Sequence, residues 1–397
     1  MSRTRPTWLA IPVALLGLFT TPVASAEGAG EASSATTITA LEACPVPVST
    51  SSSTPAGPAG PAISAVGKRA ATSTMEADKA AVAGTGVQLP ADEAPHHGPV
   101  EWWYFNGHLR AVGPNGEVHC YGFEYVTFQF ILPIGEPTYV ADFSVTDLDR
   151  KAFQYAEKNA SYPVPSTKDR FALHTGPWSM AGGSGTDALH ASVSSYAIDL
   201  HLRTTEPAVL EGANGLVSLG PIGGSDYYSW TSLLTSGTIV DHGVTMKVSG
   251  ISWMDHQWGQ MALASGAGWD WFSIQLSDGE QFMVYFIRDS KSAIVDRFAT
   301  EVTAAGKVTH LSGQISEREL SHWRSPASGI TYSSGWDVSL PGAHFTIAPY
   351  LPDQELDLQK SQGNSYWEGD VSVTGTVDGH RVGGVGYTEI NPPGGLL

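Results

Sequence analysis

The sequence has few basic side chains and few cysteines, and it lacks the short motifs of several common enzyme classes. Its 21 Lys and Arg residues face 39 Asp and Glu residues, which gives a formal net charge of −18 at pH 7. Because a surface this acidic repels phosphate groups, we do not expect nucleic acids or anionic membranes as partners. No G-x-S-x-G, Walker A, G-x-G-x-x-G, H-E-x-x-H or C-x-x-C motif occurs. Their absence argues against α/β-hydrolase esterases, NTPases and nicotinamide enzymes.

Only two cysteines are present, Cys44 and Cys120. Two cysteines are not a disulfide framework, although an exported protein can form a disulfide. One lies in low-complexity sequence and the other in an expected strand. The sequence leaves open whether they pair or remain separate thiols.

The N-terminus has the features of a cleaved export signal. Arg3 and Arg5 precede an apolar run at residues 8–19, and Ala24-Ser25-Ala26 provides a small-residue cleavage site. The run is shorter than the roughly 20 residues that span a bilayer. We therefore expect a secreted protein that uses a Sec-type signal, residues 1–26, with no transmembrane span in its mature form.

Composition divides the rest of the chain into a linker and an organised region. Residues 27–84 are rich in Ser, Thr, Ala, Pro and Gly, so they cannot bury enough apolar surface to offset their ordering entropy, and we expect a disordered linker. From residue 85 onward, short aromatic and β-branched runs alternate with turn signals, and no sustained helical periodicity occurs. This pattern predicts an all-β sandwich or barrel fold.

A weak internal repeat divides the organised region into two parts. W-x-Y-F-x3-L, beginning at Trp102, aligns with W-x-W-F-x3-L, beginning at Trp269. We expect two related antiparallel β-barrel domains in tandem, at residues 85–262 and 263–397.

The densest group of reactive side chains is W-M-D-H-Q-W-G, at residues 253–259. In an extended strand, His256 and Trp258 share one face and Asp255 lies on the other. A histidine beside an indole on a concave sheet face is suited to proton transfer to an apolar substrate, because the indole stabilises a developing cation. The alternative is a packed tryptophan beside a hydrogen-bonded core histidine.

Two further carboxylates are candidates for acid catalysis. Asp270, in G-W-D-W-F, shares a face with Phe272, and burial among apolar side chains would raise its pKa. The alternative for Asp270 is a solvated carboxylate at the start of a strand. Glu101 shares a face with Trp103, and we expect it to be buried and paired beside the same cavity.

Two adjacent histidines, His96 and His97, precede Glu101 and raise the question of a metal site. Adjacent histidines on a strand or turn point apart, and no third ligand has supporting spacing, so we expect no metal ligands. We interpret His108 and His119 as ordinary residues on the polar faces of strands.

Aromatic residues on other strands complete the candidate site. Tyr285, in F-M-V-Y-F, either projects its phenol into the interior or packs its ring with the hydroxyl group at the rim. Near the C-terminus, Y-W-E-G at residues 366–369 and G-Y-T-E at residues 386–389 are interpreted as strand edges that close the second domain.

Four motifs in order carry a family resemblance. They are H-x-G-P-x-E-W-W-Y-x-x-G-x-L, which ends at Leu109, then W-M-D-H-x-W-G, W-D-W-F-x-x-Q-L and Y-W-E-G. Together they resemble the secreted lipocalin-like proteins related to hydroxyneurosporene synthase, or carotenoid 1,2-hydratase (the CrtC/AttH-like group). The resemblance covers about residues 91–390. It implies two lipocalin-like barrels and cofactor-independent hydration of apolar polyenes.

The resemblance also implies roles for individual residues. The H-x-W pair of the hydratases corresponds to His256 and Trp258, and their tyrosine corresponds to Tyr285. Ile287 stands where the hydratases carry an aspartate.

The resulting hypothesis is a secreted, cofactor-independent hydratase that adds water to a C=C bond of a hydrophobic carotenoid or terpenoid. In it, Asp270 or Glu101 protonates the alkene and His256 activates the water. The predicted catalytic residues are His256, Asp270, Asp255, Glu101 and Tyr285, and the predicted substrate-binding residues are Trp258, Trp103, Trp271 and Tyr104. The alternatives are a non-catalytic carrier of a hydrophobic ligand and a secreted hydrolase.

Overall fold

The computed structural model describes Cys44, residues 86–204 and residues 206–394. The expected signal peptide, and the expected linker except for Cys44, lie outside the described residues. Within the described part of the chain the helices are three short 3-10 turns, η1 (Ala91–Glu93), η2 (Gly220–Ile222) and η3 (Leu263–Ser265). No helix of that part is long and apolar enough to cross a membrane. Strands make up the other elements, so the prediction of an all-β fold is confirmed.

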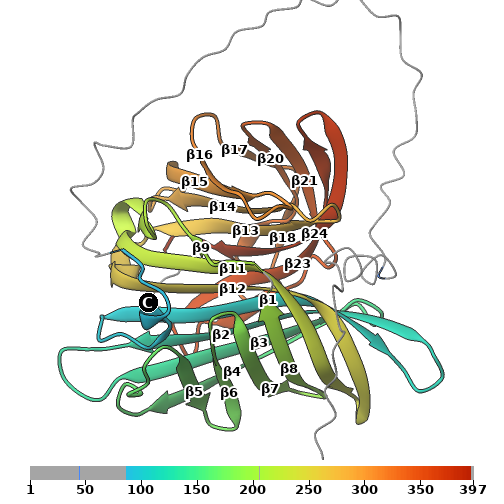
Figure 1. Ribbon diagram of the computed structural model, residues 1–397, viewed down its shortest axis with the longest axis horizontal. Helices are drawn as coiled ribbons and strands as arrows, with labels where there is room; N and C mark the ends of the chain where they lie inside the picture. The colour runs from blue at the N-terminus through green and yellow to red at the C-terminus, as the bar shows by residue number, and fades with distance from the viewer. Residues whose placement is uncertain (1–43, 45–85, 205, 395–397) are drawn as a thin grey trace, which may run out of the picture. The chain divides into compact units, whose positions relative to one another are not determined.

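The first sheet has 12 antiparallel strands, and its main path runs β4-β3-β2-β1-β12-β11-β8-β7-β6-β5 (Figure 1). It curls around one core, because β7 at the far side contacts β3 and β5 contacts β4. The strands are β1 (Val100–Val112), β2 (Val118–Phe130), β3 (Thr138–Asp147), β4 (Ala152–Ser161), β5 (Phe171–Thr175), β6 (Trp178–Gly183), β7 (Thr186–Val193), β8 (Tyr196–Thr204), β9 (Val209–Leu210), β10 (Leu216–Ser218), β11 (Gly223–Asp241) and β12 (Val244–Met261).

The second sheet has 10 antiparallel strands, with the order β16-β15-β14-β13-β24-β23-β21-β20-β17 along its main path. Its strands are β13 (Gly268–Leu276), β14 (Gln281–Arg288), β15 (Ile294–Val302), β16 (Val308–Leu311), β17 (Ser316–Glu319), β20 (Trp336–Leu340), β21 (Ala343–Pro349), β22 (Glu355–Leu358), β23 (Asn364–Val377) and β24 (His380–Asn391). A separate hairpin consists of β18 (His322–Arg324) and β19 (Thr331–Ser333).

The two sheets share one connection pattern. In the first, β1 pairs with the following strand β2 and with the closing strand β12. In the second, β13 pairs in the same way with β14 and β24. The aligned motifs that begin at Trp102 and Trp269 lie on β1 and β13, so the sequence repeat corresponds to equivalent first strands.

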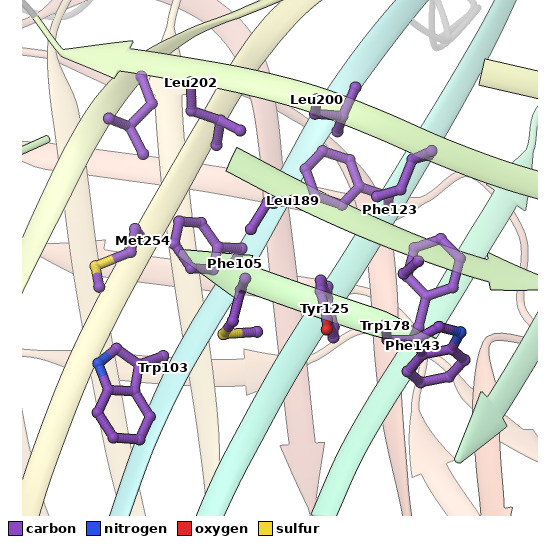
Figure 2. Packing of buried hydrophobic residues seen from close by; sticks show 14 of the residues in the cluster. Trp103, Phe105, Phe123, Tyr125, Phe143, Trp178, Leu189, Leu200, Leu202 and Met254 are labelled. Atoms are coloured by element: carbon purple, nitrogen blue, oxygen red, sulfur yellow. The ribbon is translucent and has the colours of Figure 1, made fainter. Parts of the chain in front are cut away.

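Side-chain alternation along these strands separates two kinds of core. Trp103 and Phe105 of β1 and Met254 of β12 point into the core of the first sheet, together with Trp178 of β6 (Figure 2). Their neighbours in the chain point the other way, into a core shared with the second sheet. This shared core includes Trp102, Tyr104, Trp253, Trp271, Tyr285 and Tyr387. Phe272 and Phe286 lie in a third core, inside the second sheet.

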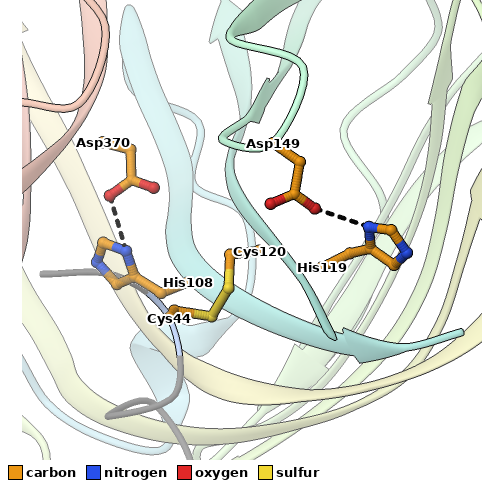
Figure 3. Close-up of a disulfide and its surroundings, with 6 residues drawn as sticks. All are labelled: Cys44, His108, His119, Cys120, Asp149 and Asp370. Carbon is orange, nitrogen blue, oxygen red and sulfur yellow. Dashed lines mark hydrogen bonds and ion pairs between the residues drawn. A yellow bond between two sulfur atoms is a disulfide. The ribbon is translucent and has the colours of Figure 1, made fainter. Parts of the chain in front are cut away.

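Cys44 and Cys120 form a disulfide with a Cα–Cα distance of 5.8 Å, which answers the question that the sequence left open. Beside it, the imidazole of His108 lies 2.9 Å from Asp370, and both side chains are buried (Figure 3). The interpretation of His108 as an ordinary polar-face residue is therefore wrong, because its strand face is covered by the second sheet. His119 is partly exposed and lies 2.7 Å from Asp149.

Candidate functional site

A row of four side chains crosses the second sheet on the face that meets the first. In the strand register, Trp271 of β13 lies opposite Tyr285 of β14 and opposite Glu389 of β24. Glu389 in turn lies opposite Glu368 of β23. Directly opposed residues of antiparallel strands share a face and lie within about 5.5 Å at their Cβ atoms, so the register alone places two carboxyl groups side by side.

A matching row crosses the first sheet. Asp255 of β12 lies opposite Tyr104 of β1. The Tyr104 hydroxyl donates a hydrogen bond of 2.9 Å to Glu368, and the Trp271 indole N–H lies 3.3 Å from the hydroxyl group of Tyr227. The first contact joins the two rows directly, and the second joins them through Tyr227, whose hydroxyl also donates to Asp255.

A cavity of about 30 Å³ lies between the two rows. A space of roughly 10–15 Å³ holds one water molecule, so this cavity has room for about two. No basic residue is among its lining residues, and only Phe128 and Glu389 of the lining are partly exposed. We call it the intersheet cavity, and it is lined by Trp102, Tyr104, Val126, Phe128, Asp255, Trp269, Trp271, Tyr285, Tyr366, Glu368 and Glu389.

Burial changes the protonation of the carboxyl groups of this cavity. It raises the pKa of Glu389 to about 7. It also raises the pKa of Glu368 well above the usual range, and the neighbouring Glu389 adds to that shift. Two carboxylates that share one site cannot both ionise easily. The pair therefore keeps at least one proton near neutral pH.

Asp255, on the opposite wall, has a different environment. Its carboxylate accepts hydrogen bonds from the Ser229 hydroxyl at 2.6 Å, the Tyr227 hydroxyl at 2.7 Å and the Trp253 indole at 2.7 Å. Burial raises its pKa to about 6, and these three donors oppose that shift. The two walls therefore differ, because Asp255 ionises more readily than the Glu368–Glu389 pair. Such a separation of pKa values identifies acid and base partners.

Glu101 and His256 lie on the other faces of β1 and β12, inside the first sheet. His256 Nε2 and His96 Nδ1 lie 2.7 Å and 2.8 Å from the same oxygen of Glu101. Burial alone would raise the pKa of Glu101, but these two hydrogen bonds outweigh it and hold the pKa below its usual value. Trp258 stacks on His96 at 4.1 Å, and Trp103 stacks on His256 at 4.7 Å.

The nine predicted site residues thus fall into three places. Asp255, Tyr104, Trp271 and Tyr285 line the intersheet cavity. His256, Glu101, Trp103 and Trp258 form a cluster inside the first sheet, as alternation along residues 253–259 predicted. The expectation that Glu101 and His256 border the same cavity as Trp271 is therefore wrong, because they point away from it.

Asp270, the ninth predicted residue, lies in a third place. Asp270 is buried on the face of Phe272, as expected, but it forms an ion pair of 2.6 Å with Arg288. Arg288 also contacts Glu317. Asp270 therefore belongs to an ion-pair network and is not among the residues that line the intersheet cavity.

Sequence reasoning missed Glu368 and Glu389 as site residues. Their motifs, Y-W-E-G and G-Y-T-E, lie inside β23 and β24 and not at strand edges. The signal was present, because each motif places a glutamate two residues from an aromatic side chain on the same strand face. Tyr366 and Tyr387 both belong to the buried side-chain set.

The fold and cavity define a class of two-sheet β protein with a buried site for a small ligand, and comparisons with known proteins place the chain within it. The model of the AttH-like family matches residues 80–392. The chain belongs to the AttH-like family.

Two solved structures and one further relative are similar to the chain. An AttH protein from Nitrosomonas europaea is 28% identical, with a TM-score of 0.70 over 78% of this chain and 98% of that one. A kievitone hydratase from Nectria haematococca is 20% identical, with a TM-score of 0.63 over 78% and 93% of the two chains, and shows the fold alone. A kievitone hydratase from Fusarium solani subsp. phaseoli is 26% identical over 214 residues. That alignment spans 51% of this chain and 58% of the relative.

Proposed function

We propose that this protein is a hydratase that adds water across a C=C bond of a hydrophobic, unsaturated small molecule in the intersheet cavity. The observation that carries the proposal is the Glu368–Glu389 pair, which keeps a proton near neutral pH and faces the ionisable Asp255 across a cavity large enough for water. The similarity to kievitone hydratases supports water addition as the reaction. The family resemblance extends the proposal to carotenoid- or terpenoid-type substrates.

The first step is protonation of the double bond. The carboxyl O–H of Glu389 gives its proton to one alkene carbon, and the π electrons form the new C–H bond. Positive charge develops on the second carbon, beside the indole of Trp271, which lies opposite Glu389 in the strand register. An aromatic face attracts a cation, and tryptophan does so most strongly. Exclusion of bulk water strengthens that attraction.

The second step is addition of water. A water molecule in the cavity forms the C–O bond and loses one proton to the carboxylate of Asp255. That proton then returns through cavity water to Glu389, so the substrate gains one H and one OH and the protein is unchanged. Burial raises the pKa of Glu389 to about 7, which keeps part of it protonated, and Tyr104 fixes the neighbouring Glu368 through a 2.9 Å hydrogen bond. A ligand larger than about two water molecules must displace side chains that line the cavity. Phe128 is one of the lining side chains, and it is partly exposed to solvent.

The test is turnover of a panel of polyenes and terpenoids by the full chain in heavy-oxygen water. We expect a product one water heavier than its substrate, with the label in the new hydroxyl group. Glu389→Gln should lower the rate by about 10²- to 10⁴-fold, the usual contribution of a positioned proton donor. The exposed Glu136→Gln is the matched control and should be fully active. A labelled product formed equally fast by Glu389→Gln would exclude this glutamate as the acid, and an unaltered co-purifying ligand would indicate a carrier.

We also propose that the protein is exported. The N-terminal signal features support this proposal, and so does the Cys44–Cys120 disulfide, because disulfides persist mainly in oxidising compartments. N-terminal sequencing of protein from culture fluid should begin after Ala26. Protein found only in the cytosol, with its signal intact and both thiols reduced, would contradict export.

A further inference from the structure

The three side chains of the cluster inside the first sheet have donor atoms that converge. One potential ligand atom from each of His96, Glu101 and His256 lies within 4.8 Å of the other two. His96 Nδ1 and His256 Nε2 lie 2.8 Å and 2.7 Å from Glu101 Oε1. A tetrahedral zinc ion with metal–ligand distances near 2.0 Å holds its ligand atoms roughly 3.3 Å apart. Small side-chain rotations therefore suffice to place one ion between these atoms.

Hydrogen bonds also hold the second ring nitrogen of His256, the one that faces away from His96 and Glu101. His256 Nδ1 lies 3.1 Å from the Tyr228 hydroxyl, which lies 2.7 Å from Glu93, while His256 Nε2 lies 2.7 Å from Glu101. With a metal ion on Nε2, the Nδ1–H of His256 would donate to Tyr228, whose O–H donates to Glu93.

The outer atoms of the same three side chains are already held in place. Glu101 Oε2 accepts hydrogen bonds from the backbone N–H of His96 at 2.8 Å and from Gln129 at 3.0 Å. His96 Nε2 lies 3.5 Å from Asp92. Metal-binding histidines commonly give their second N–H to an oxygen acceptor, which fixes the ring and raises its basicity. Both histidines have such an acceptor.

The cluster also has a route for an ion to enter. Glu101 and His256 are fully buried, but the side chain of His96 is 23% exposed. His96 lies in the segment before β1 and stacks on Trp258, so an ion can enter from solvent by way of its imidazole. The bound ion would tie this segment to β1 and β12.

From this geometry we propose that His96, Glu101 and His256 bind one divalent transition-metal ion such as Zn²⁺, with one coordination position left to water or a small ligand. Two imidazoles and a carboxylate are a ligand set suited to such ions and not to Ca²⁺ or Mg²⁺, which prefer oxygen ligands. The site lies on the opposite strand faces from the intersheet cavity, so it is independent of the proposed hydration.

The test measures metal binding by the full chain. Chelator-stripped protein is incubated with Zn²⁺ and passed through gel filtration, and the metal content per chain is measured by mass spectrometry. Competition with a chromogenic chelator then gives the affinity. We expect one tightly bound ion for the wild-type protein. His96→Ala should weaken its binding by at least about 100-fold, because losing a group that merely supports a ligand already costs roughly 10- to 100-fold.

Two further variants complete the design. His97→Ala removes the neighbouring exposed histidine and should keep the ion, whereas Tyr228→Phe should weaken binding by about 10- to 100-fold. Substitution of Co²⁺ in the wild-type protein should shift the imidazole N–H signals of two histidines in the NMR spectrum, a readout that needs no variant. Wild-type affinity no higher than that of His96→Ala, equal loss in His97→Ala, or no shifted histidine signals would overturn the proposal.

Discussion

The buried carboxyl groups on the two sides of β1 and β12 have pKa values shifted in opposite directions. Inside the first sheet, Glu101 meets two imidazoles and its pKa is lowered. On the intersheet face, Glu368 and Glu389 meet phenols, indoles and each other, and burial raises their pKa values. Asp255 and His256 are adjacent in the chain yet lie on different sides of this division. Glu101 and Glu368 are both fully buried, so the partner groups decide whether a buried acid ionises.

The largest effect on stability should come from removing the negative charge of Glu101, which pairs with two imidazoles inside the first sheet. Glu101→Gln leaves two buried imidazoles without their carboxylate and should lower the free energy of unfolding by about 3 kcal/mol, as for a broken buried ion pair. Glu368→Gln should cost about 1 kcal/mol or less at pH 7, because the wild-type side chain is already neutral there. Urea unfolding of both variants measures the difference. An equal loss in the two would show that the faces do not differ.

The pH dependence of stability tests whether the carboxyl groups between the sheets are protonated in the folded protein. Burial raises the pKa of Glu389 and of Asp142 to about 7, whereas unfolded Glu and Asp titrate near pH 4. Between these values the folded chain binds more protons than the unfolded chain, so the free energy of unfolding falls as pH rises. We expect the protein to be about 1 to 3 kcal/mol less stable at pH 8 than at pH 5.

Urea midpoints across that pH range measure this slope. Asp142→Asn removes one group that gains a proton on folding and should flatten the slope, while Glu136→Gln, in an exposed turn, should not change it. A free energy of unfolding that rises between pH 5 and pH 8 would mean that the intersheet carboxyl groups are ionised in the folded protein.

A small effect on stability should come from the loss of a single hydrogen bond between the sheets. Tyr104→Phe removes the donor to Glu368 and should cost about 0.5 to 1.5 kcal/mol of stability. It should also slow hydration, because Glu368 is less firmly placed, but by less than Glu389→Gln does. Unfolding and turnover measured on one preparation test both statements. A larger loss of turnover than in Glu389→Gln would point to the phenol as the proton donor.

The fold could be predicted because its signals are local. Alternation along residues 253–259 placed His256 and Trp258 on one face and Asp255 on the other, as the structure has them. The aligned motifs on β1 and β13 reflect a shared strand order. The domain boundaries and the roles of the site residues stay predictions.

The site was less predictable because its contacts depend on strand register over long distances. Glu101 and His256 are separated by 155 residues, and no spacing in the sequence indicates that they meet. The ion pair of Asp270 was not foreseen for the same reason, since nothing near Asp270 in the chain reveals that Arg288 lies opposite that end of β13. His256 supplies the third potential ligand that the spacing around His96 and His97 did not show.

The equivalence of the two sheets has a consequence for the origin of the cavity. Tyr104 of β1 faces Asp255 of the closing strand in the first sheet, and Trp271 of β13 faces Glu389 of the closing strand in the second. Each half of the chain thus contributes one aromatic–carboxyl pair from matching strands. A single ancestral half that formed a two-fold symmetric homodimer through this face would already have enclosed two such pairs, since a two-fold interface repeats the same patch. Gene fusion would then have freed the two copies to diverge, one towards the acid and the other towards the base.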